Sequence, residues 1–292
     1  MPATCARTLA APCNAPDTKD IQLTTSTLLG PLSALLFHRS LTLELAKREV
    51  LGRYRGASFG LLWSLLSPFF LLCIYTFAFG TVMGGRWPEI QSGQTHFSII
   101  LFAGLIVHGF FAECLNRAPS LILANPNFVK RIIFPLDILP WPMVLSALFH
   151  TCMNVIVFII LRLVMDGDFT WTIILLPLVM LPLVVLTFGV AWFLASLGVY
   201  FRDIVQITGV VSMALLFLSS ALMPVDSVPA AYRWVFVANP LTFIIDQARD
   251  VMLWGRMPDW LGLGKYLLVA TVIMYLSRAW FLTTRKGFAD VL

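Results

Sequence analysis

The sequence predicts an all-α integral membrane protein with six transmembrane helices, on the basis of three observations. First, 59% of the 292 residues are hydrophobic, only 12% are charged, and the mean hydropathy is +0.87. Second, the apolar runs are continuous rather than alternating, which favours helices over a closed barrel as the membrane-spanning structure. Third, the charges stop abruptly after Arg53 and Arg55, and residues 57–85 contain none. That stretch exceeds the roughly 20 apolar residues that a helix needs to cross a bilayer.

The N-terminal part is expected to stay on the cytoplasmic side. Residues 1–27 are polar, lack the apolar core of a secretory signal, and are predicted to be a flexible cytoplasmic tail. Residues 28–52 are predicted to form an amphipathic interface helix, which is too charged to cross the membrane and lies among the headgroups. An ordinary helix packed against the bundle is the alternative. Leu45 falls off the apolar arc, whose members are Leu32, Leu35, Leu36, Leu43, Ala46 and Val50.

Six charge-poor stretches are predicted to span the membrane: residues 57–85, 90–112, 138–161, 169–201, 204–225 and about 263–284. Charge checks the count, because cytoplasmic loops carry an excess of Lys and Arg. With six spans and both termini cytoplasmic, the two short outer loops carry only Arg86 and Arg162. Five spans would leave Arg285 and Lys286 outside. The sixth span contains Arg278, which is acceptable if its side chain reaches an interface.

The segment between the fifth and sixth spans, residues 226–262, is too long for a simple loop. Its apolar middle begins at Trp234 and is too short to cross the membrane. Asn239 and Pro240 form a turn signal at the centre of this stretch. The pattern predicts two short re-entrant helices on the extracytoplasmic side, and a cap lying on the membrane surface is the alternative.

The cytoplasmic segment 117–135 mixes apolar side chains with cations. Three prolines divide it into short pieces, and Asn125 or Asn127 can cap the helix that carries Lys130 and Arg131. A short amphipathic helix of this kind can dock into a partner's groove through its apolar residues. The simpler interpretation is that the two cations only set the topology, and both interpretations can hold together.

The sequence contains no energy source of its own. The phosphate-binding loop G-x-x-x-x-G-K-[ST] is absent, and the nearest text, GLGKY at residues 262–266, lacks the first glycine and the Ser or Thr. Proton-coupled carriers usually place acids in the middle of the bilayer. Here the acids lie at the ends of the predicted spans, which argues against ion coupling.

Enzymatic chemistry has little support either. The five cysteines and four histidines are scattered without the spacing of a metal site. Asp166 and Asp168 form a DGD turn without a nearby His or Lys in the sequence, so an integral membrane glycosyl or phosphoryl transferase is kept only as an alternative. The net charge of +5 sits beside apolar spans, which is typical of topology determinants rather than of nucleic-acid binding.

Aromatic residues are abundant, with 23 Phe and 9 Trp. In the predicted first span, Phe59, Trp63, Phe70 and Phe77 fall on one helical face. Such a stripe most often faces lipid or the core. The sharper hypothesis is that it lines a passage for sugars, whose apolar faces stack on aromatic rings.

Four motifs in this order carry a family resemblance: RYRGASFGLLWSLLSP at residues 53–68, NPNFVKRIIFPLDILP at 125–140, VYFRDI at 199–204, and the Asn239-Pro240 pair. The chain resembles the transmembrane subunit of ABC exporters for lipid-linked polysaccharides, the family of O-antigen, teichoic-acid and capsule export permeases. The resemblance covers residues 28–292. It implies a single transmembrane domain that is a transport subunit rather than an enzyme, in the bacterial inner (cytoplasmic) membrane.

The resemblance further implies a homodimer that works with two copies of a separate ATPase, so that ATP and Mg²⁺ bind to the partner and this chain binds no cofactor. By similarity, Asn127, Phe128, Lys130 and Arg131 belong to the ATPase coupling region, and Trp234, Asn239 and Pro240 belong to the extracytoplasmic gate. The polymer would be carried on a polyprenyl diphosphate, which Arg53 and Arg55 are placed to contact, because the planar guanidinium suits phosphate. Anchoring by positive charge is the alternative role of these two arginines.

Other functions stay open at this point. Within transport, the substrate is O-antigen, teichoic acid, capsular polysaccharide, or a drug or small lipid. From other classes, the alternatives are the membrane transferase and a purely structural membrane anchor, against which the absence of a soluble domain counts.

Overall fold

The structure is a computed structural model that describes residues 39–75, 77, 96–129, 135–167 and 169–291. The predicted tail, residues 1–27, lies outside this part of the chain. Residues 40–292 form one compact unit. Within the described ranges every regular element is a helix, which confirms the all-α prediction for them.

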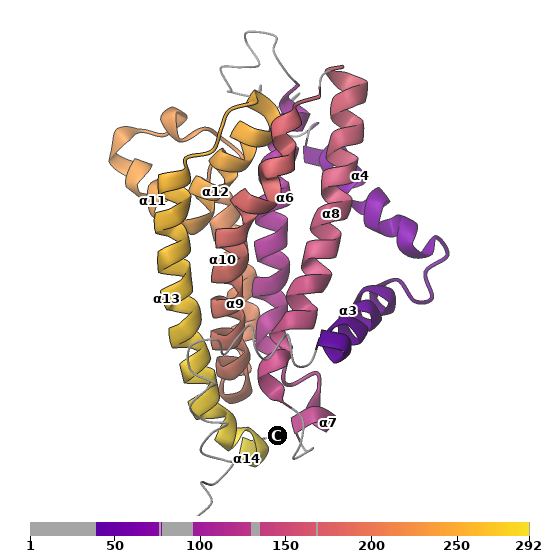
Figure 1. Ribbon diagram of the computed structural model, residues 1–292, viewed down its shortest axis with the longest axis vertical. Coiled ribbons are helices and arrows are strands. Elements are labelled where there is room, and N and C mark those ends of the chain that lie inside the picture. The colour runs from indigo at the N-terminus through magenta and orange to yellow at the C-terminus, as the bar shows by residue number, and fades with distance from the viewer. Residues whose placement is uncertain (1–38, 76, 78–95, 130–134, 168, 292) are drawn as a thin grey trace, which may run out of the picture. The chain divides into compact units, whose positions relative to one another are not determined.

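The α-helices of the described residues are α3 (Arg39–Arg53), α4 (Trp63–Tyr75), α6 (Phe97–Arg117), α7 (Pro126–Val129), α8 (Pro140–Met165), α9 (Leu176–Tyr200), α10 (Ile204–Phe217), α11 (Arg233–Ala238), α12 (Pro240–Arg249), α13 (Trp260–Thr284) and α14 (Phe288–Val291). The long helices run roughly alongside one another with α10 among them, whereas α3 and α4 lie to one side, beyond α8 (Figure 1). The most extensive packing is between α9 and α13, and α6 contacts α8, α12, α10 and α9.

Among the described residues, four helical stretches are long and apolar enough to cross a membrane: Phe97–Ser120, Leu136–Met165, Trp171–Tyr200 and Trp260–Gly287. They overlap the second, third, fourth and sixth predicted spans, and the first of them ends eight residues later than predicted. The first and fifth correspond to two shorter apolar helices, Gly60–Ile74 and Ile204–Phe217. α10 is short because the backbone leaves the helix after Phe217, whereas the end of the first predicted span passes into residues outside the described ranges. The multi-pass helical architecture is therefore clear, and the count of six stays a prediction.

Small residues let the helices of the core approach closely. A Cβ atom on Gly198 of α9 would collide with the backbone of Pro119, just after α6. A Cβ atom on Gly189 would lie 3.0 Å from the Cα atom of Met274 on α13. Small residues play this role in membrane helix bundles, where close van der Waals contact supplies much of the association energy. α6 is the most enclosed of the four long stretches.

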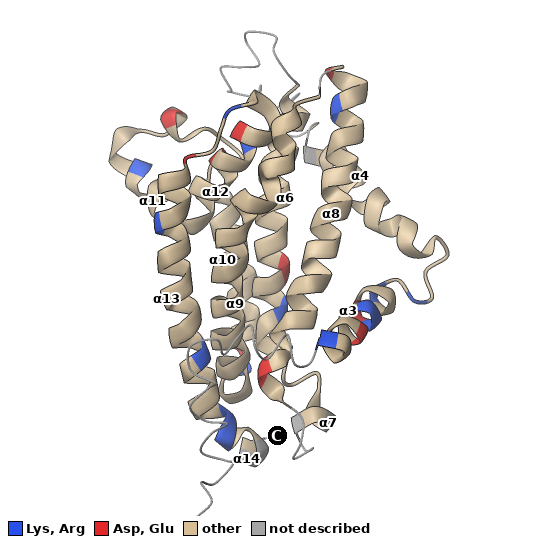
Figure 2. Ribbon diagram, in the orientation of Figure 1, with Lys and Arg blue, Asp and Glu red and all other residues tan. Residues whose placement is uncertain are grey.

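Charged residues gather on α3, around α11 and α12 and near the helix ends, and they are sparse along the long helices (Figure 2). Arg278 is an exception, since it lies within α13 and is buried. Its guanidinium donates to Asp137 Oδ2 at 3.2 Å. The indole of Trp192 donates to the Asp137 carbonyl at 3.1 Å. This carboxylate, just before α8, provides the partner that a buried arginine requires.

Candidate functional site

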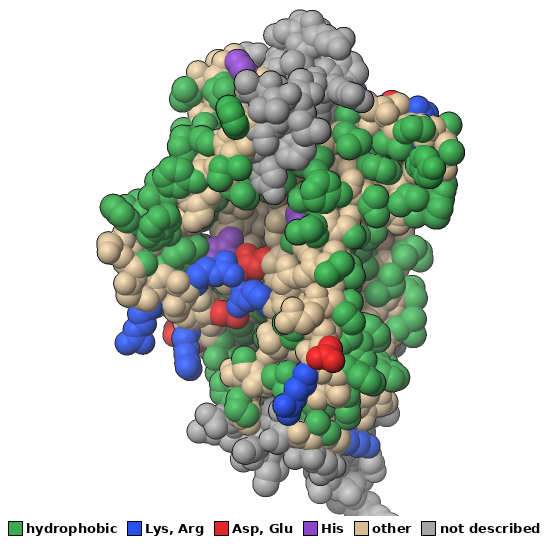
Figure 3. Space-filling model, turned by 180° about the vertical axis from the view of Figure 1, so that it is seen from behind, with side chains coloured by type: hydrophobic (Ala, Val, Ile, Leu, Met, Phe, Trp, Pro, Cys, Tyr) green, Lys and Arg blue, Asp and Glu red, His purple; other side chains and the backbone are tan. Residues whose placement is uncertain are grey.

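A cavity of about 620 Å³ lies between α4, α6, α8 and the turn that follows α3. Its wall is apolar along α4 and the middle of α6, where Leu71, Phe102 and Leu105 line it. Its other end is polar, with Arg53, Tyr54, Glu113, His150 and Asn154. Basic, acidic and histidine side chains gather together on the face seen in Figure 3, among largely apolar neighbours. The cavity therefore combines an apolar trough with a charged end.

Glu113 is the centre of that charged end. Its Oε1 atom lies 2.8 Å from Arg53 Nη2 and 3.0 Å from Arg117 Nη1, and its Oε2 atom lies 3.0 Å from His150 Nδ1. Arg117 is one helical turn further along α6, whereas Arg53 and His150 come from α3 and α8. One partly buried carboxylate thus holds two guanidinium groups and an imidazole at the end of the cavity.

His150 cannot satisfy both of its close neighbours at once. Its Nδ1 atom lies 2.9 Å from Arg53 Nη1 and 3.0 Å from Glu113 Oε2. A guanidinium only donates and an ionised carboxylate only accepts, so Nδ1 either accepts from Arg53 or donates to Glu113. The Nε2 atom is buried without a hydrogen-bond partner among the described residues. The imidazole can therefore replace Arg53 as a donor to Glu113 whenever Arg53 moves away.

Arg117 extends the charged cluster beyond the cavity. Besides Glu113, it forms a close ion pair with Glu49 on α3. Burial raises the pKa of Glu49, and Arg117 opposes that rise. Arg117 thus bridges Glu113, which lines the cavity, and Glu49 on α3. Glu113, Arg117 and Glu49 form a continuous ionic connection from the cavity to α3.

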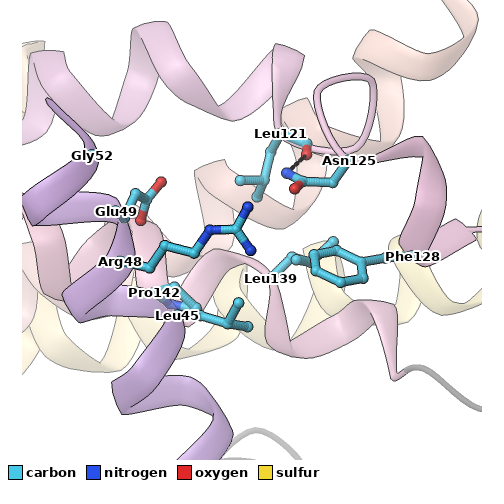
Figure 4. Close-up of a pocket in the computed structure, with 9 residues that line it drawn as sticks. All are labelled: Leu45, Arg48, Glu49, Gly52, Leu121, Asn125, Phe128, Leu139 and Pro142. Carbon is cyan, nitrogen blue, oxygen red and sulfur yellow. Dashed lines mark hydrogen bonds between the residues drawn. The ribbon is translucent and has the colours of Figure 1, made fainter. Parts of the chain in front are cut away.

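A second, smaller cavity of about 300 Å³ lies between α3, the turn after α6, α7 and the start of α8. Figure 4 shows Arg48 extending from α3 into this space, toward Asn125 and Phe128. Asn125 donates from its side chain to the Leu121 carbonyl at 2.9 Å, which orders the turn that follows α6. Glu49 lines the same space. The cavity is accordingly called the α3–α7 groove, and it shares Glu49 with the ionic connection.

The face that α3 turns toward the bundle carries small and polar side chains. Thr42 and Ala46 are buried, and Glu49 pairs with Arg117 of α6. Within the predicted apolar arc, Leu43 is 61% exposed, whereas Leu45, outside the arc, lines the α3–α7 groove. The contact of the arc with the headgroups stays a prediction.

The segment between α10 and α13 contains two short helices, α11 and α12, with Asn239 and Pro240 at the break, as the turn signal predicted. Asn239 Oδ1 accepts from the Leu241 amide at 2.9 Å and so caps α12. Its Nδ2 atom donates to the carbonyls of Leu215 and Leu218 at 3.0 and 2.9 Å, at the end of α10. The Asn239 side chain therefore forms hydrogen bonds with the backbone at both the start of α12 and the end of α10. Trp234 on α11 is 69% exposed.

Arg249 holds the irregular backbone that follows α10. It is almost fully buried, and it donates to the carbonyls of Ser220 and Ala221 at 2.6 and 2.8 Å and to that of Ile100 at 3.2 Å. Helix ends leave carbonyls without intrahelical partners, and these must be satisfied when they are buried. A Cβ atom on Gly104 of α6 would lie 2.7 Å from the Arg249 guanidinium. α12, α10 and α6 are thus joined at one charged side chain.

The residues predicted for a sugar passage are not all brought together. Trp63 lines the large cavity, with its ring edge-to-face to that of Phe59 at 6.0 Å between centroids. Phe59 precedes α4, and it is exposed, as are Phe70 and Phe77. Of the two predicted phosphate contacts, Arg53 lies at the cavity, and Arg55 is exposed in the turn after α3.

Two of the four predicted coupling residues lie among the residues that the structure describes. Phe128 lines the α3–α7 groove, and Asn127 belongs to α7. Lys130 and Arg131 lie outside the described residues. Sequence reasoning gave no role to Glu113, Arg117, His150 and Glu49. The available signals were the i, i+4 spacing of Glu113 and Arg117 and the presence of polar residues at the ends of apolar spans, which are often functional.

One further pair concerns the transferase alternative. Asp166 at the end of α8 lies 2.7 Å from Nδ1 of His96, the residue before α6, although no histidine is near it in the sequence. The pair joins the ends of two adjacent helices. Asp168, its predicted companion, lies outside the described residues.

The comparisons with known proteins agree with one another. The family model described as ABC-2 type transporter matches residues 40–253. The O-antigen export system permease protein RfbA of Myxococcus xanthus is 25% identical over 255 residues, which cover 87% of this chain and 95% of that protein. An RfbA protein of Klebsiella pneumoniae is 25% identical over 74% of this chain and 82% of its own. The polysialic acid transport protein KpsM of Escherichia coli is 27% identical over 82% of this chain and 92% of its own.

Proposed function

The chain belongs to the ABC-2 type transporter family, and from this premise we propose that it is the permease subunit of an ATP-driven polysaccharide exporter. The substrate is an O-antigen-type polymer carried on a polyprenyl diphosphate, moved across the bacterial inner membrane. The relatives named as O-antigen export permeases support the polymer class. The observation that carries the proposal furthest is the charged end of the large cavity, where a displaceable carboxylate holds Arg53.

The diphosphate is bound by exchange of partners. The Arg53 side chain is 42% exposed at the cavity, so an incoming anion reaches its planar fork. When Arg53 turns to the diphosphate, Glu113 keeps Arg117 and gains His150 as donor, so no carboxylate is left unpaired.

The first sugars are expected to follow the diphosphate along the aromatic side of the cavity. Trp63 lies in the same cavity wall as Arg53, and Asn154 and Ser67 offer hydrogen bonds to hydroxyl groups. A ring face beside polar groups is the usual arrangement for holding a sugar, whose apolar face stacks while its rim is hydrogen-bonded. Phe59 extends the aromatic surface next to Trp63.

ATP is hydrolysed by a separate ATPase, which docks at the α3–α7 groove. The groove offers Leu45 and Phe128 as apolar contacts and Arg48 as a charged one. Movement of α3 on docking or ATP binding passes through Glu49 and Arg117 to Glu113, and so to the grip of Glu113 on Arg53. The ionic connection thus couples the ATPase site to substrate release.

The functional unit is a homodimer with two ATPase subunits. The exposed apolar side chains of α10, which include Val210, Met213 and Phe217, would be buried against a second copy. α11 and α12 form the extracytoplasmic gate, dipping into the membrane from outside, and Asn239 transmits the position of α10 to them. Six spans with both termini cytoplasmic complete this arrangement.

The direct test is to reconstitute the chain with its ATPase in vesicles and to measure transfer of lipid-linked polymer. ATP-dependent transfer is expected, and its absence in a complex that still hydrolyses ATP overturns the proposal. Likeness to KpsM makes capsular polysaccharide the second candidate substrate. Glycan analysis of a deletion strain separates the two, because loss of O-antigen and loss of capsule leave different surface polymers.

A further inference from the structure

A third cavity, of about 580 Å³, shares no lining residue with the charged one. It is a groove between α6, α9, α12 and α13, with α13 as its longest wall. Its apolar lining includes Phe111, Leu186, Val190, Val269 and Ile273, and its only charged lining residue is Lys265. Lys265 is exposed, and it forms no hydrogen bond or ion pair with any residue that the structure describes.

The end of the groove that holds Lys265 is built rigidly. The Phe243 ring stacks on that of Tyr266, with the centroids 6.2 Å apart, and the Tyr266 hydroxyl donates to the Pro240 carbonyl at 2.9 Å. A Cβ atom on Gly262 would lie 2.6 Å from the Phe243 ring, so glycine is required for this contact. Gly262 of GLGKY therefore serves helix packing and capping, since its amide also donates to Asp259 Oδ1 at 3.0 Å.

The dimensions of the groove match one leaflet of a bilayer. Its lining residues on α13 run from Gly262 to Ile273, roughly 16 Å at the rise of about 1.5 Å per residue. Half of the hydrocarbon core of a bilayer is about 15 Å thick. Lys265 lies in the second turn of α13, which begins at Trp260. A lysine close to the end of a membrane helix can extend its side chain to the headgroups.

We propose that this groove, called the α12–α13 groove, binds one anionic glycerophospholipid of the bilayer. An acyl chain lies along Val269 and Ile273, and the headgroup phosphate pairs with the Lys265 ammonium. The charge commits the site to an anionic lipid, because a purely apolar groove would accept any acyl chain. The bound lipid braces α12 against α13 and so supports the helix that carries Arg249.

Native mass spectrometry of the full chain, delipidated in detergent and titrated with lipid, tests this proposal. Phosphatidylglycerol is compared with phosphatidylcholine of the same acyl chains. One phosphatidylglycerol is expected to bind with about five-fold preference, the usual effect of one lysine near a lipid surface. Equal binding of the two lipids overturns the proposal, and so does stronger binding of a polyprenyl phosphate, which would make the groove a site for the exported carrier.

Variants locate the binding. Lys265→Ala should abolish the preference and Lys265→Arg should keep it, whereas Lys286→Ala, at the far end of the same helical stretch, should change nothing. Val269→Trp, at an exposed position of the wall, should displace both lipids. If Lys265→Ala and Lys286→Ala lower phosphatidylglycerol binding equally, the site is not at Lys265. Because the titration needs neither ATP nor polymer, its outcome is independent of the proposed transport function.

Discussion

The Arg53 guanidinium lies 2.8 Å from the carboxylate of Glu113, on a different helix, at the polar end of the largest cavity discussed above. Two nitrogens of this guanidinium are engaged, one with Glu113 and the other with His150. In the proposed function, a substrate anion must compete with Glu113 for Arg53.

Arg53→Lys should lower export about tenfold, because an ammonium cannot engage two partners in the geometry of the planar fork. A difference of that size corresponds to one hydrogen bond to a charged group, about 1.5 kcal/mol. Arg55→Lys is the matched control and should export normally, since Arg55 is exposed in the turn after α3. Both variants keep the positive charge that sets topology. Equal losses for the two variants, measured as ATP-dependent transfer in vesicles, contradict the role assigned to Arg53.

The ionic connection predicts non-additive effects along Glu49, Arg117 and Glu113. Arg117→Ala should reduce, without abolishing, the stimulation of ATPase activity by lipid-linked polymer and should leave basal hydrolysis in place, because the proposed ATP site is on the partner. The double variant with Glu113→Gln should lose little more than Arg117→Ala alone, since neighbouring groups of one network share an interaction energy of about 0.5–3 kcal/mol. Strictly additive losses indicate two independent sites.

Glu49→Gln tests how Glu49 affects the stability of the folded chain, separately from its proposed part in coupling the ATPase to the cavity. Burial raises the pKa of Glu49 in the folded chain, so its ionised form is disfavoured there relative to the unfolded chain. The stability contribution of this group is therefore complete below the ordinary pKa of a glutamate and is lost as pH rises through the raised value. At neutral pH, Glu49→Gln should melt no lower than the unsubstituted chain, and the difference should vanish in acid. A clearly lower melting temperature at pH 7 contradicts the assigned direction, whatever happens to coupling.

Substitutions of Asn239 distinguish the two structural roles of its side chain, the cap on α12 and the hydrogen bonds to the end of α10. Asn239→Asp keeps the oxygen that caps α12 but loses the amide donor to the Leu215 and Leu218 carbonyls. It should lower the free energy of unfolding by about 1–3 kcal/mol, the cost of buried acceptors without partners. Asn239→Ala also removes the cap and should cost about 1 kcal/mol more. Trp234→Ala, on exposed α11, is the control and should leave the melting temperature unchanged.

Much of the fold followed from local pattern, because helices in lipid pair their backbone within one segment. The positions of α6, α8, α9 and α13 and the break at Asn239 were predictable for this reason. The length of α10 was not predictable from local pattern. The turn after Phe217 depends on hydrogen bonds that the Asn239 and Arg249 side chains, at the two ends of α12, donate to its carbonyls. A sequence window contains none of these contacts.

The charged cluster was beyond local pattern for a related reason. Arg53 and Glu113 each read as a charge at the edge of an apolar run, and His150 as an isolated polar residue. Only the packing of α3, α6 and α8 brings them within 3 Å or so of one another. Likewise, the sequence gives no sign that the buried Arg278 pairs with Asp137, which lies 141 residues before it. Charged residues near membrane spans are usually paired, and a hydropathy pattern does not identify their partners.

Two glycines on neighbouring helices provide a paired test of the packing. Gly198→Ala on α9 should lower the free energy of unfolding by about 1–3 kcal/mol, because its Cβ atom would collide with the Pro119 backbone, which cannot rotate away as a side chain can. Gly209→Ala on α10 meets nothing within 4 Å and should stabilise by about 0.4–1 kcal/mol through the unfolded chain. Thermal unfolding of both variants in the same detergent measures the difference. If Gly198→Ala melts at or above Gly209→Ala, α9 does not contact the end of α6 as closely as described. If Gly209→Ala alone falls, that position is covered, as it would be by a second copy of the chain packed on α10.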